Sequence, residues 1–183
     1  MAIIPVTVYG DEILKNKTKP VDAVNEAIIS SIKDMFDTMR NASGIGLAAN
    51  QVGIDKSIFI IDLRPVEGYE DSKPMVFINP EIVEMSDETV RLEEGCLSLP
   101  NLRAEIVRPE IIKINYLDTD EKEASLEADD WLARVIQHEF DHLIGKMIPD
   151  RVDEEVRKAI SGELTNITER RVEIDYPITD KED

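Results

Sequence analysis

The chain contains only two histidines, His138 and His142, and they lie four residues apart. Around them, over residues 126–143, apolar side chains cover most of the circumference of a predicted helix. A helix that is apolar on most sides packs in the centre of a fold. Residues four apart stack on one helix face at about 6 Å, so the two imidazoles can hold one metal ion. We therefore expect a fold built around a central, metal-binding helix.

Glu139 lies between these histidines, roughly 100° around the helix axis from His138. Zinc hydrolases with an H-E-x-x-H helix use this arrangement to place a general base beside the metal. The alternative is a pair of histidines that hydrogen-bond within the core and bind no metal. The carboxylates of Glu139 and Asp141, interleaved with the histidines on a buried helix, favour the metal.

Short strands are predicted before this helix, at 58–61, 75–78, 82–85, 89–93, 103–107 and 111–117. Apolar and polar residues alternate in the last of them, which is typical of a sheet with one buried face. An amphipathic helix is predicted at 24–39 and a short surface helix at 152–164. These elements indicate an α+β fold with short, mostly antiparallel sheets packed around the central helix.

Composition and charge restrict the class of protein. The 183 residues fit a single domain, 1–183, that can bury a core without disulfides. A net charge of −18 repels phosphates and anionic lipid headgroups, which argues against nucleic acid or membrane as the main ligand. A single cysteine cannot form an internal disulfide, and the first ten residues lack the features of a signal peptide. We expect a soluble cytoplasmic protein, and nothing in the sequence demands more than a monomer.

Two other segments supply candidates for a third ligand and for a substrate site. Catalytic zinc sites use three protein ligands and leave one position open. Cys96 is the only other strong soft ligand, in the segment 93–100 (EEGCLSLP). By itself, a lone cysteine is more often an inert buried thiol. The segment 44–51 (GIGLAANQ) by itself indicates only a tight turn packed with small residues.

Taken together and in order, GIGLAAxQ at 44–51, EGCLS at 94–98 and QHExDHLxG at 137–145 resemble the three signature motifs of the peptide deformylase family. The resemblance covers the chain from about residue 4 to residue 150. It implies an α+β enzyme that hydrolyses the formyl group from the N-terminal formylmethionine of newly made polypeptides and releases formate. It also implies one divalent ion per chain, held by Cys96, His138 and His142. The ion would be Fe(II) in the cell, with Zn, Ni or Co as alternatives.

The resemblance also assigns roles around the metal. Glu139 takes the place of the general base, which later hands its proton to the departing amine. The side-chain amide of Gln51 and the backbone N–H of Leu97 are expected to stabilise the oxyanion. The formylated peptide is expected to lie extended along Ile45 and Gly46, pairing main chain with main chain.

Further residues are expected to bind substrate or to orient the ligands. Arg103 could meet the peptide backbone, and Ile45, Leu97 and Val135 are candidates for the methionine pocket, although each could equally be ordinary core. A ligating imidazole normally donates its other N–H to a carboxylate, carbonyl or water. The resemblance to the family implies that Glu94, Arg108 and Asp141 provide this support. For Arg108 the alternative is a surface salt bridge.

Two rival interpretations use the same helix. A zinc peptidase would take Glu163, 21 residues after His142, as its third ligand, although the adjacent Gly162 disfavours a ligand-bearing helix. A purely structural metal would need a fourth protein ligand, which here would have to be Asp or Glu.

The C-terminus departs from the best-studied family members, in which a basic helix docks on the ribosome. Residues 151–183 contain six basic and ten acidic residues. Such a segment is poorly suited to ribosomal RNA, so we do not expect ribosome docking through it. We expect residues 165–183 to form a loose acidic tail.

Overall fold

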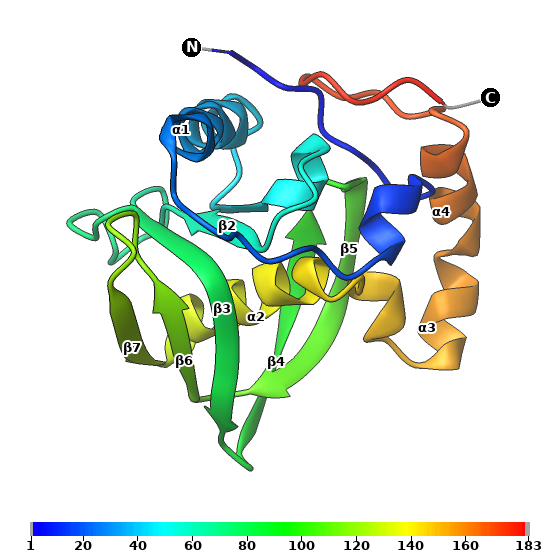
Figure 1. The fold of residues 1–183 in the computed structure, drawn as a ribbon. Coiled ribbons are helices and arrows are strands. Elements are labelled where there is room, and N and C mark those ends of the chain that lie inside the picture. The colour runs from blue at the N-terminus through cyan, green and yellow to red at the C-terminus, as the bar shows by residue number, and fades with distance from the viewer. Residues whose placement is uncertain (1, 182–183) are drawn as a thin grey trace.

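The computed structural model describes residues 2–181 and shows an α+β fold with two antiparallel sheets (Figure 1). The larger sheet has five strands in the order β1-β2-β3-β6-β7. Its strands are β1 (Gly46–Ala48), β2 (Ile58–Ile61), β3 (Met75–Met85), β6 (Ile112–Leu117) and β7 (Glu123–Ala128). The smaller sheet is the hairpin of β4 (Thr89–Cys96) and β5 (Leu99–Pro109). The predicted fold class is confirmed.

Helix α2 (Asp130–Leu143) is the central helix of the fold, with nine of its 14 residues buried. It packs against β1 and β2 of the larger sheet. On the hairpin side, the side chains of Arg134 and Gln137 donate hydrogen bonds to backbone carbonyls of β5. The core beside it contains Phe59 and Phe77, whose stacked rings lie 4.6 Å apart between centroids. This helix is therefore held by both sheets, as its apolar circumference predicts.

Helix α2 begins later than predicted, because residues 126–128 belong to β7. The side chains of β7 alternate between exposed and partly buried, and the strand pairs with β6 from Leu117↔Glu123 to Ile112↔Ala128. Asp129 is the extended N-cap residue that separates strand from helix. The apolar residues at 126 and 128 fit a strand as well as a helix, and pairing with β6 selects the strand.

Two strands predicted at 75–78 and 82–85 are one continuous strand, β3. Its register against β6 shifts between Ile78 and Glu81, next to Asn79 with a positive φ of 47°. An irregularity of this kind bends a strand without ending it. The break in the apolar pattern therefore marks a bulge in β3.

The remaining helices lie outside the sheets. Helix α1 (Glu26–Asn41) agrees with the predicted amphipathic helix, and Asn25 caps it by accepting a hydrogen bond from the N–H of Ile28 at 3.0 Å. The helix predicted at 152–164 is instead two helices, α3 (Glu154–Ala159) and α4 (Ser161–Thr168). Three short 3-10 helices complete the set: Glu12–Lys15, Ala49–Val52 and Ile148–Asp150. No helix within residues 2–181 has the length and apolar character needed to cross a membrane.

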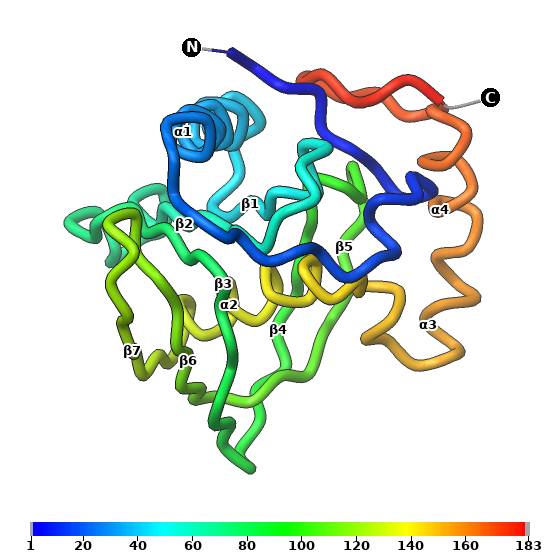
Figure 2. The backbone as a smooth tube through the Cα atoms, in the orientation of Figure 1, coloured from blue at the N-terminus to red at the C-terminus, as the bar shows by residue number. Residues whose placement is uncertain are grey.

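The C-terminal segment packs along the N-terminal segment, which corrects the expectation of a loose tail (Figure 2). Ile178 forms a parallel bridge with Val6. Arg170 makes an ion pair with Asp11, and the hydroxyl of Thr179 donates to the same carboxylate at 2.6 Å. These specific contacts hold the segment in place despite its acidic composition. A count of charged residues cannot predict them. Residues 182 and 183 lie outside the described residues.

Candidate active site

Three side chains with metal-binding atoms meet where α2 passes the end of β4. His138 and His142 lie on one face of α2, and their ring centroids are 5.1 Å apart. Cys96 is the last residue of β4, and its Sγ lies 3.3 Å from Nε2 of His142. The candidate ligand atoms of all three residues lie within 4.8 Å of one another, and within residues 2–181 no other group of His, Cys, Asp and Glu is close enough to hold an ion.

The donor set of these residues fits a divalent transition metal. A thiolate and two imidazole nitrogens suit Zn(II) and the other borderline metals. Burial lowers the pKa of His142, which keeps its imidazole in the neutral form that binds metals. Because three protein ligands leave a tetrahedral site one position short, the arrangement matches a catalytic site.

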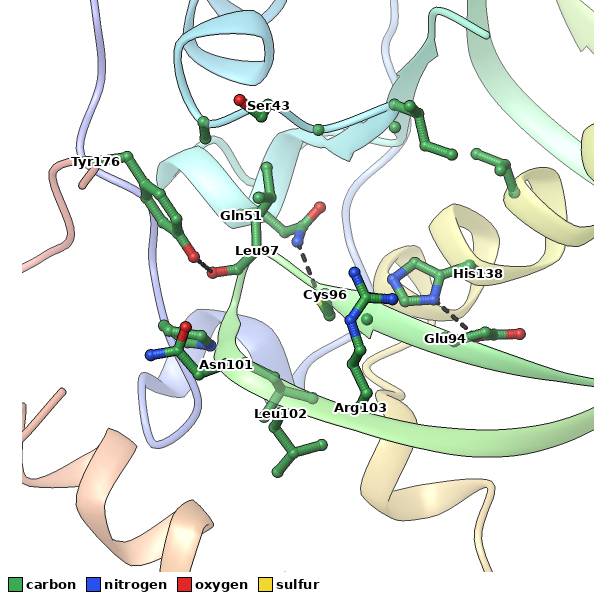
Figure 3. A pocket seen from close by; sticks show the side chains of 18 of the residues that line it. Ser43, Gln51, Glu94, Cys96, Leu97, Asn101, Leu102, Arg103, His138 and Tyr176 are labelled. Carbon is green, nitrogen blue, oxygen red and sulfur yellow. Dashed lines mark hydrogen bonds and ion pairs between the residues drawn. The ribbon is translucent and has the colours of Figure 1, made fainter. Parts of the chain in front are cut away.

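Glu94 orients His138. Its carboxylate accepts a hydrogen bond from Nδ1 of His138 at 2.9 Å, which leaves Nε2 free to face the other ligands (Figure 3). The same carboxylate accepts from Arg108 at 2.6 and 2.9 Å and from Arg134 at 2.9 Å. Burial alone would raise the pKa of Glu94, but the hydrogen bonds from Arg108 and His138 hold it below its usual value. Glu94 is therefore a buried anion that fixes the ring of a candidate ligand.

Asp141 and Asn50 hold the rest of α2 in place. Arg108 bridges the two carboxylates, since it also donates to Asp141 at 2.8 Å. Arg151 donates to both oxygens of the Asp141 carboxylate. The side-chain amide of Asn50 donates to the backbone carbonyl of His142 at 2.7 Å. Arg108 is buried, so the alternative of a surface salt bridge does not hold for it.

The carboxylate of Glu139 is buried beside the candidate ligands. Only 3% of the residue is exposed, and its Oε2 has no hydrogen-bond partner among residues 2–181. Burial raises the pKa of Glu139 to about 7. A Cβ atom at Gly46 would overlap this carboxylate, so the glycine allows β1 to pass directly against it. A carboxyl group with such a pKa can both accept and return a proton near neutral pH.

Gln51 has a fixed amide orientation. Its Oε1 accepts from the backbone N–H of Ala48 at 2.8 Å, so its Nε2 must point the other way. Nε2 donates to Oγ of Ser98 at 3.0 Å. It also lies 3.5 Å from Sγ of Cys96 (Figure 3). The contact with sulfur is long, so one N–H of this group remains only weakly engaged.

A cavity of about 820 Å³ opens onto this cluster. Its wall includes nine of the predicted site residues besides the cysteine: Ile45, Gly46, Gln51, Glu94, Leu97, Arg103, Val135, His138 and Glu139. His142, Arg108 and Asp141 do not line the cavity, and each is at most 5% exposed. Strand β1 forms one edge of the larger sheet and contributes Gly46 to the wall.

Several residues that line the cavity were not predicted from the sequence. Trp131 and Arg134 come from α2 and were not among the predicted site residues. An arginine within an otherwise apolar stretch was the available signal for Arg134, because a buried guanidinium requires acceptors. Residues 173–176 also line the cavity, and no pattern in the sequence connects them to a motif about 80 residues earlier.

Comparison with known proteins decides the family. The family model described as polypeptide deformylase matches residues 3–158. The chain belongs to the peptide deformylase family. It is 45% identical to a peptide deformylase from Salinibacter ruber, over 99% of this chain and 96% of the relative. It is 44% identical to a peptide deformylase from Chlorobaculum tepidum, over 96% and 94% of the two chains.

Solved structures of peptide deformylases share the fold. The enzyme from Ehrlichia chaffeensis in complex with actinonin superposes with a TM-score of 0.84 at 36% identity, covering 94% of this chain and all of the other (100%). A plant peptide deformylase gives a TM-score of 0.87 at 34% identity, covering 93% and 92%. The chain is thus a metal-dependent hydrolase that removes the N-formyl group from the N-terminal formylmethionine of new polypeptides and releases formate.

Membership of the peptide deformylase family overturns the rival interpretations. The peptidase interpretation needs Glu163, which is an exposed residue of α4 and is not part of the candidate ligand group. The structural-metal interpretation needs a fourth ligand, and the group contains three residues.

Proposed function

We propose that Cys96, His138 and His142 hold the single divalent ion of this deformylase. The observation that carries the proposal is the convergence of one sulfur and two imidazole nitrogens within 4.8 Å at the base of the cavity. The hydrogen bond from His138 to Glu94 supports it, because it presents Nε2 as the free ligand atom. For the metal itself we propose Fe(II) in the cell, with Zn, Ni or Co able to occupy the same ligands.

The bound ion supplies Lewis acidity, which polarises the formyl carbonyl and lowers the pKa of water. A thiolate ligand offsets part of the ion's charge, so a protein base is needed beside it. We propose that Glu139 accepts the proton of the water that attacks the formyl carbon. Glu139 then delivers this proton to the amine nitrogen as the C–N bond breaks, which releases formate and a free N-terminus. Its burial and its pKa of about 7 support this double role.

Gln51 and Leu97 are proposed as donors to the oxyanion that forms during the attack. Nε2 of Gln51 is aimed toward the ligand cysteine by the hydrogen bond between its Oε1 and Ala48. Leu97 follows Cys96 directly, so its backbone N–H belongs to the peptide unit that adjoins the ligand. Hydrogen-bond donors that are oriented before the reaction begins stabilise the developing charge without a free-energy cost for reorienting them.

The formylated peptide is proposed to extend the larger sheet along β1. An edge strand offers unpaired backbone groups to an extended peptide, and Gly46 brings this edge close to Glu139. The side chain of methionine would enter the apolar part of the cavity, lined by Ile45, Leu97 and Val135. Arg103 is 66% exposed in its side chain and is proposed to contact the peptide backbone.

We further propose that residues 1–183 form one catalytic domain that works as a monomer in the cytoplasm. The C-terminal segment, in which acidic residues outnumber basic ones, is held against the N-terminal segment through contacts with Asp11 and Val6. Binding to ribosomal RNA through this segment would require both charge reversal and release of these contacts. The enzyme would therefore meet nascent chains without docking through its C-terminus.

Formate release from a formyl-Met peptide tests the residue roles. Protein purified without oxygen is loaded with Fe(II) or Ni(II), and wild type is compared with Glu139→Gln and Cys96→Ala. We expect Glu139→Gln to retain one ion per chain and to lose at least 100-fold in turnover. We expect Cys96→Ala to lose the ion and the activity together. Full activity of Glu139→Gln would remove Glu139 from the mechanism.

A further inference from the structure

Tyr176, in the C-terminal segment, contacts the residue that is proposed to stabilise the oxyanion. Its hydroxyl donates a hydrogen bond to the backbone carbonyl of Leu97 at 2.8 Å (Figure 3). Both residues line the cavity, and the ring of Tyr176 approaches from the side opposite α2 (Figure 3). A segment nearly 80 positions further along the chain thus reaches the residue next to Cys96.

Leu97 lies in the turn that joins the two strands of the hairpin. Leu97 and Ser98 form the two-residue turn between β4, which ends at Cys96, and β5, which begins at Leu99. The carbonyl of Ser98 accepts from the backbone N–H of Tyr9 at 2.9 Å. The carbonyl of Leu97 accepts from the hydroxyl of Tyr176. The two carbonyls of the turn are therefore held by segments from opposite ends of the chain.

The position of Tyr176 is itself fixed by the packing of its segment. The bridge between Ile178 and Val6 follows two residues later, and the side-chain amide of Asn101 donates to the backbone carbonyl of Glu173 at 3.0 Å on the other side. Thr179 and Arg170 attach the segment to Asp11. The hydroxyl of Tyr176 is consequently presented to the turn by a supported backbone.

We propose that Tyr176 is a positioning residue for deformylation, which fixes the backbone of Leu97 so that its N–H is aimed at the developing oxyanion. The proposal rests on the role proposed above for the N–H of Leu97. An oxyanion donor stabilises the transition state only if it is oriented before the charge develops. A hydrogen bond to the carbonyl of the same residue limits rotation about the Leu97 backbone, because N–H and carbonyl are joined through two dihedral angles. The C-terminal segment thereby becomes part of the active site.

Tyr176→Phe tests the proposal, because it removes one oxygen atom and keeps the ring. Tyr69→Phe is the matched control: it removes a tyrosine hydroxyl that donates to Asp130 at 2.9 Å, and Tyr69 does not line the cavity. Formate release is measured against the concentration of a formyl-Met peptide for wild type and both variants. For Tyr176→Phe we expect kcat to fall by about three- to tenfold, the usual scale of one neutral hydrogen bond, with KM changed by less than about twofold. Tyr69→Phe is expected to keep both constants.

A spectroscopic measurement tests the geometry independently of catalysis. The sequence contains a single Leu-Ser dipeptide, Leu97-Ser98, so carbonyl-¹³C leucine combined with ¹⁵N serine gives one correlation between these two residues. In Zn(II)-loaded protein, which is diamagnetic, we expect the Leu97 carbonyl signal to move in Tyr176→Phe and to stay in place in Tyr69→Phe.

The outcomes separate the two proposals. Inactive wild type with any metal would contradict the proposed function, and the carbonyl shift would still report on the contact. Active wild type with an unchanged kcat in Tyr176→Phe would overturn the positioning role. A rise in KM with kcat preserved would also overturn it, since it would assign Tyr176 to substrate binding alone.

Discussion

Substitution of Glu94 by Gln tests whether the Glu94 carboxylate balances the positive charge of the buried arginines that lie behind the candidate metal ligands. The carboxylate is 5% exposed in its side chain and accepts four hydrogen bonds, from Arg108, Arg134 and His138, at 2.6–2.9 Å. Glutamine keeps the volume but replaces one acceptor oxygen by an NH₂ group that faces these donors. Arg108 then pairs only with Asp141, which Arg151 also contacts, and Arg134 keeps its hydrogen bonds to the carbonyls of Ile106 and Val90 without a carboxylate partner among the described residues. Removing one partner from a buried ion network costs about 3–5 kcal/mol, so we expect Glu94→Gln to lower the free energy of unfolding by that amount.

Urea denaturation of metal-free protein measures this loss without the contribution of metal binding. The matched control is Glu105→Gln on the same hairpin, where an exposed carboxylate lies 3.7 Å from Arg91. An exposed pair of this kind contributes at most about 1 kcal/mol, so the control is expected to keep nearly all of its stability. In addition, metal affinity of Glu94→Gln is expected to fall by about 10- to 100-fold, because His138 loses its oriented partner. A loss of stability no larger than that of the control would refute the charge-balance argument.

Three further changes test other parts of the account. Gln51→Ala is expected to lower turnover by about 10²–10³-fold with the metal retained, the usual loss for one oxyanion donor, and wild-type turnover would exclude the role. Gly46→Ala is expected to lower kcat/KM by at least about tenfold, since its Cβ would displace the Glu139 carboxylate, and an unchanged value would show that the carboxylate can move freely. Hydrogen bonds from Arg64 hold the pKa of Asp62 below its usual value, so this carboxylate stabilises the fold above about pH 4, and the stabilisation is lost as pH falls through the lowered native pKa. Urea denaturation should therefore show that Asp62→Asn is less stable than wild type at pH 6 and similar to wild type at acidic pH, where the carboxyl group is protonated. A difference in the free energy of unfolding that does not change with pH would contradict this.

The parts of the site that the sequence predicts are those where spacing and chemistry coincide. Two histidines four apart on a helix share one face, and on α2 this face is turned toward Cys96. A ligating imidazole needs a hydrogen-bond partner for its second nitrogen, and the resemblance to the family pointed to Glu94 as one such partner. The structure has the Glu94 carboxylate bonded to Nδ1 of His138.

The parts that the sequence did not predict depend on contacts between distant segments. Leu126 and Ala128 fit both a helix and a strand, and only the pairing with β6 decides for β7. The C-terminal segment is acidic in composition, yet Arg170 and Tyr176 attach it to the domain through partners about 160 and 80 residues away. Composition describes the average of a segment, whereas these contacts depend on single side chains.

Metal titration of activity is the most direct test of the central claim that one ion held by Cys96, His138 and His142 drives deformylation. Metal-free protein is mixed with increasing Fe(II) or Ni(II) under anaerobic conditions, and formate release from a formyl-Met peptide is measured at each step. The account predicts that activity rises linearly, stops rising at one equivalent per chain, and is absent from Cys96→Ala at every ratio. Full activity without metal, or a titration of Cys96→Ala that matches wild type, would contradict it.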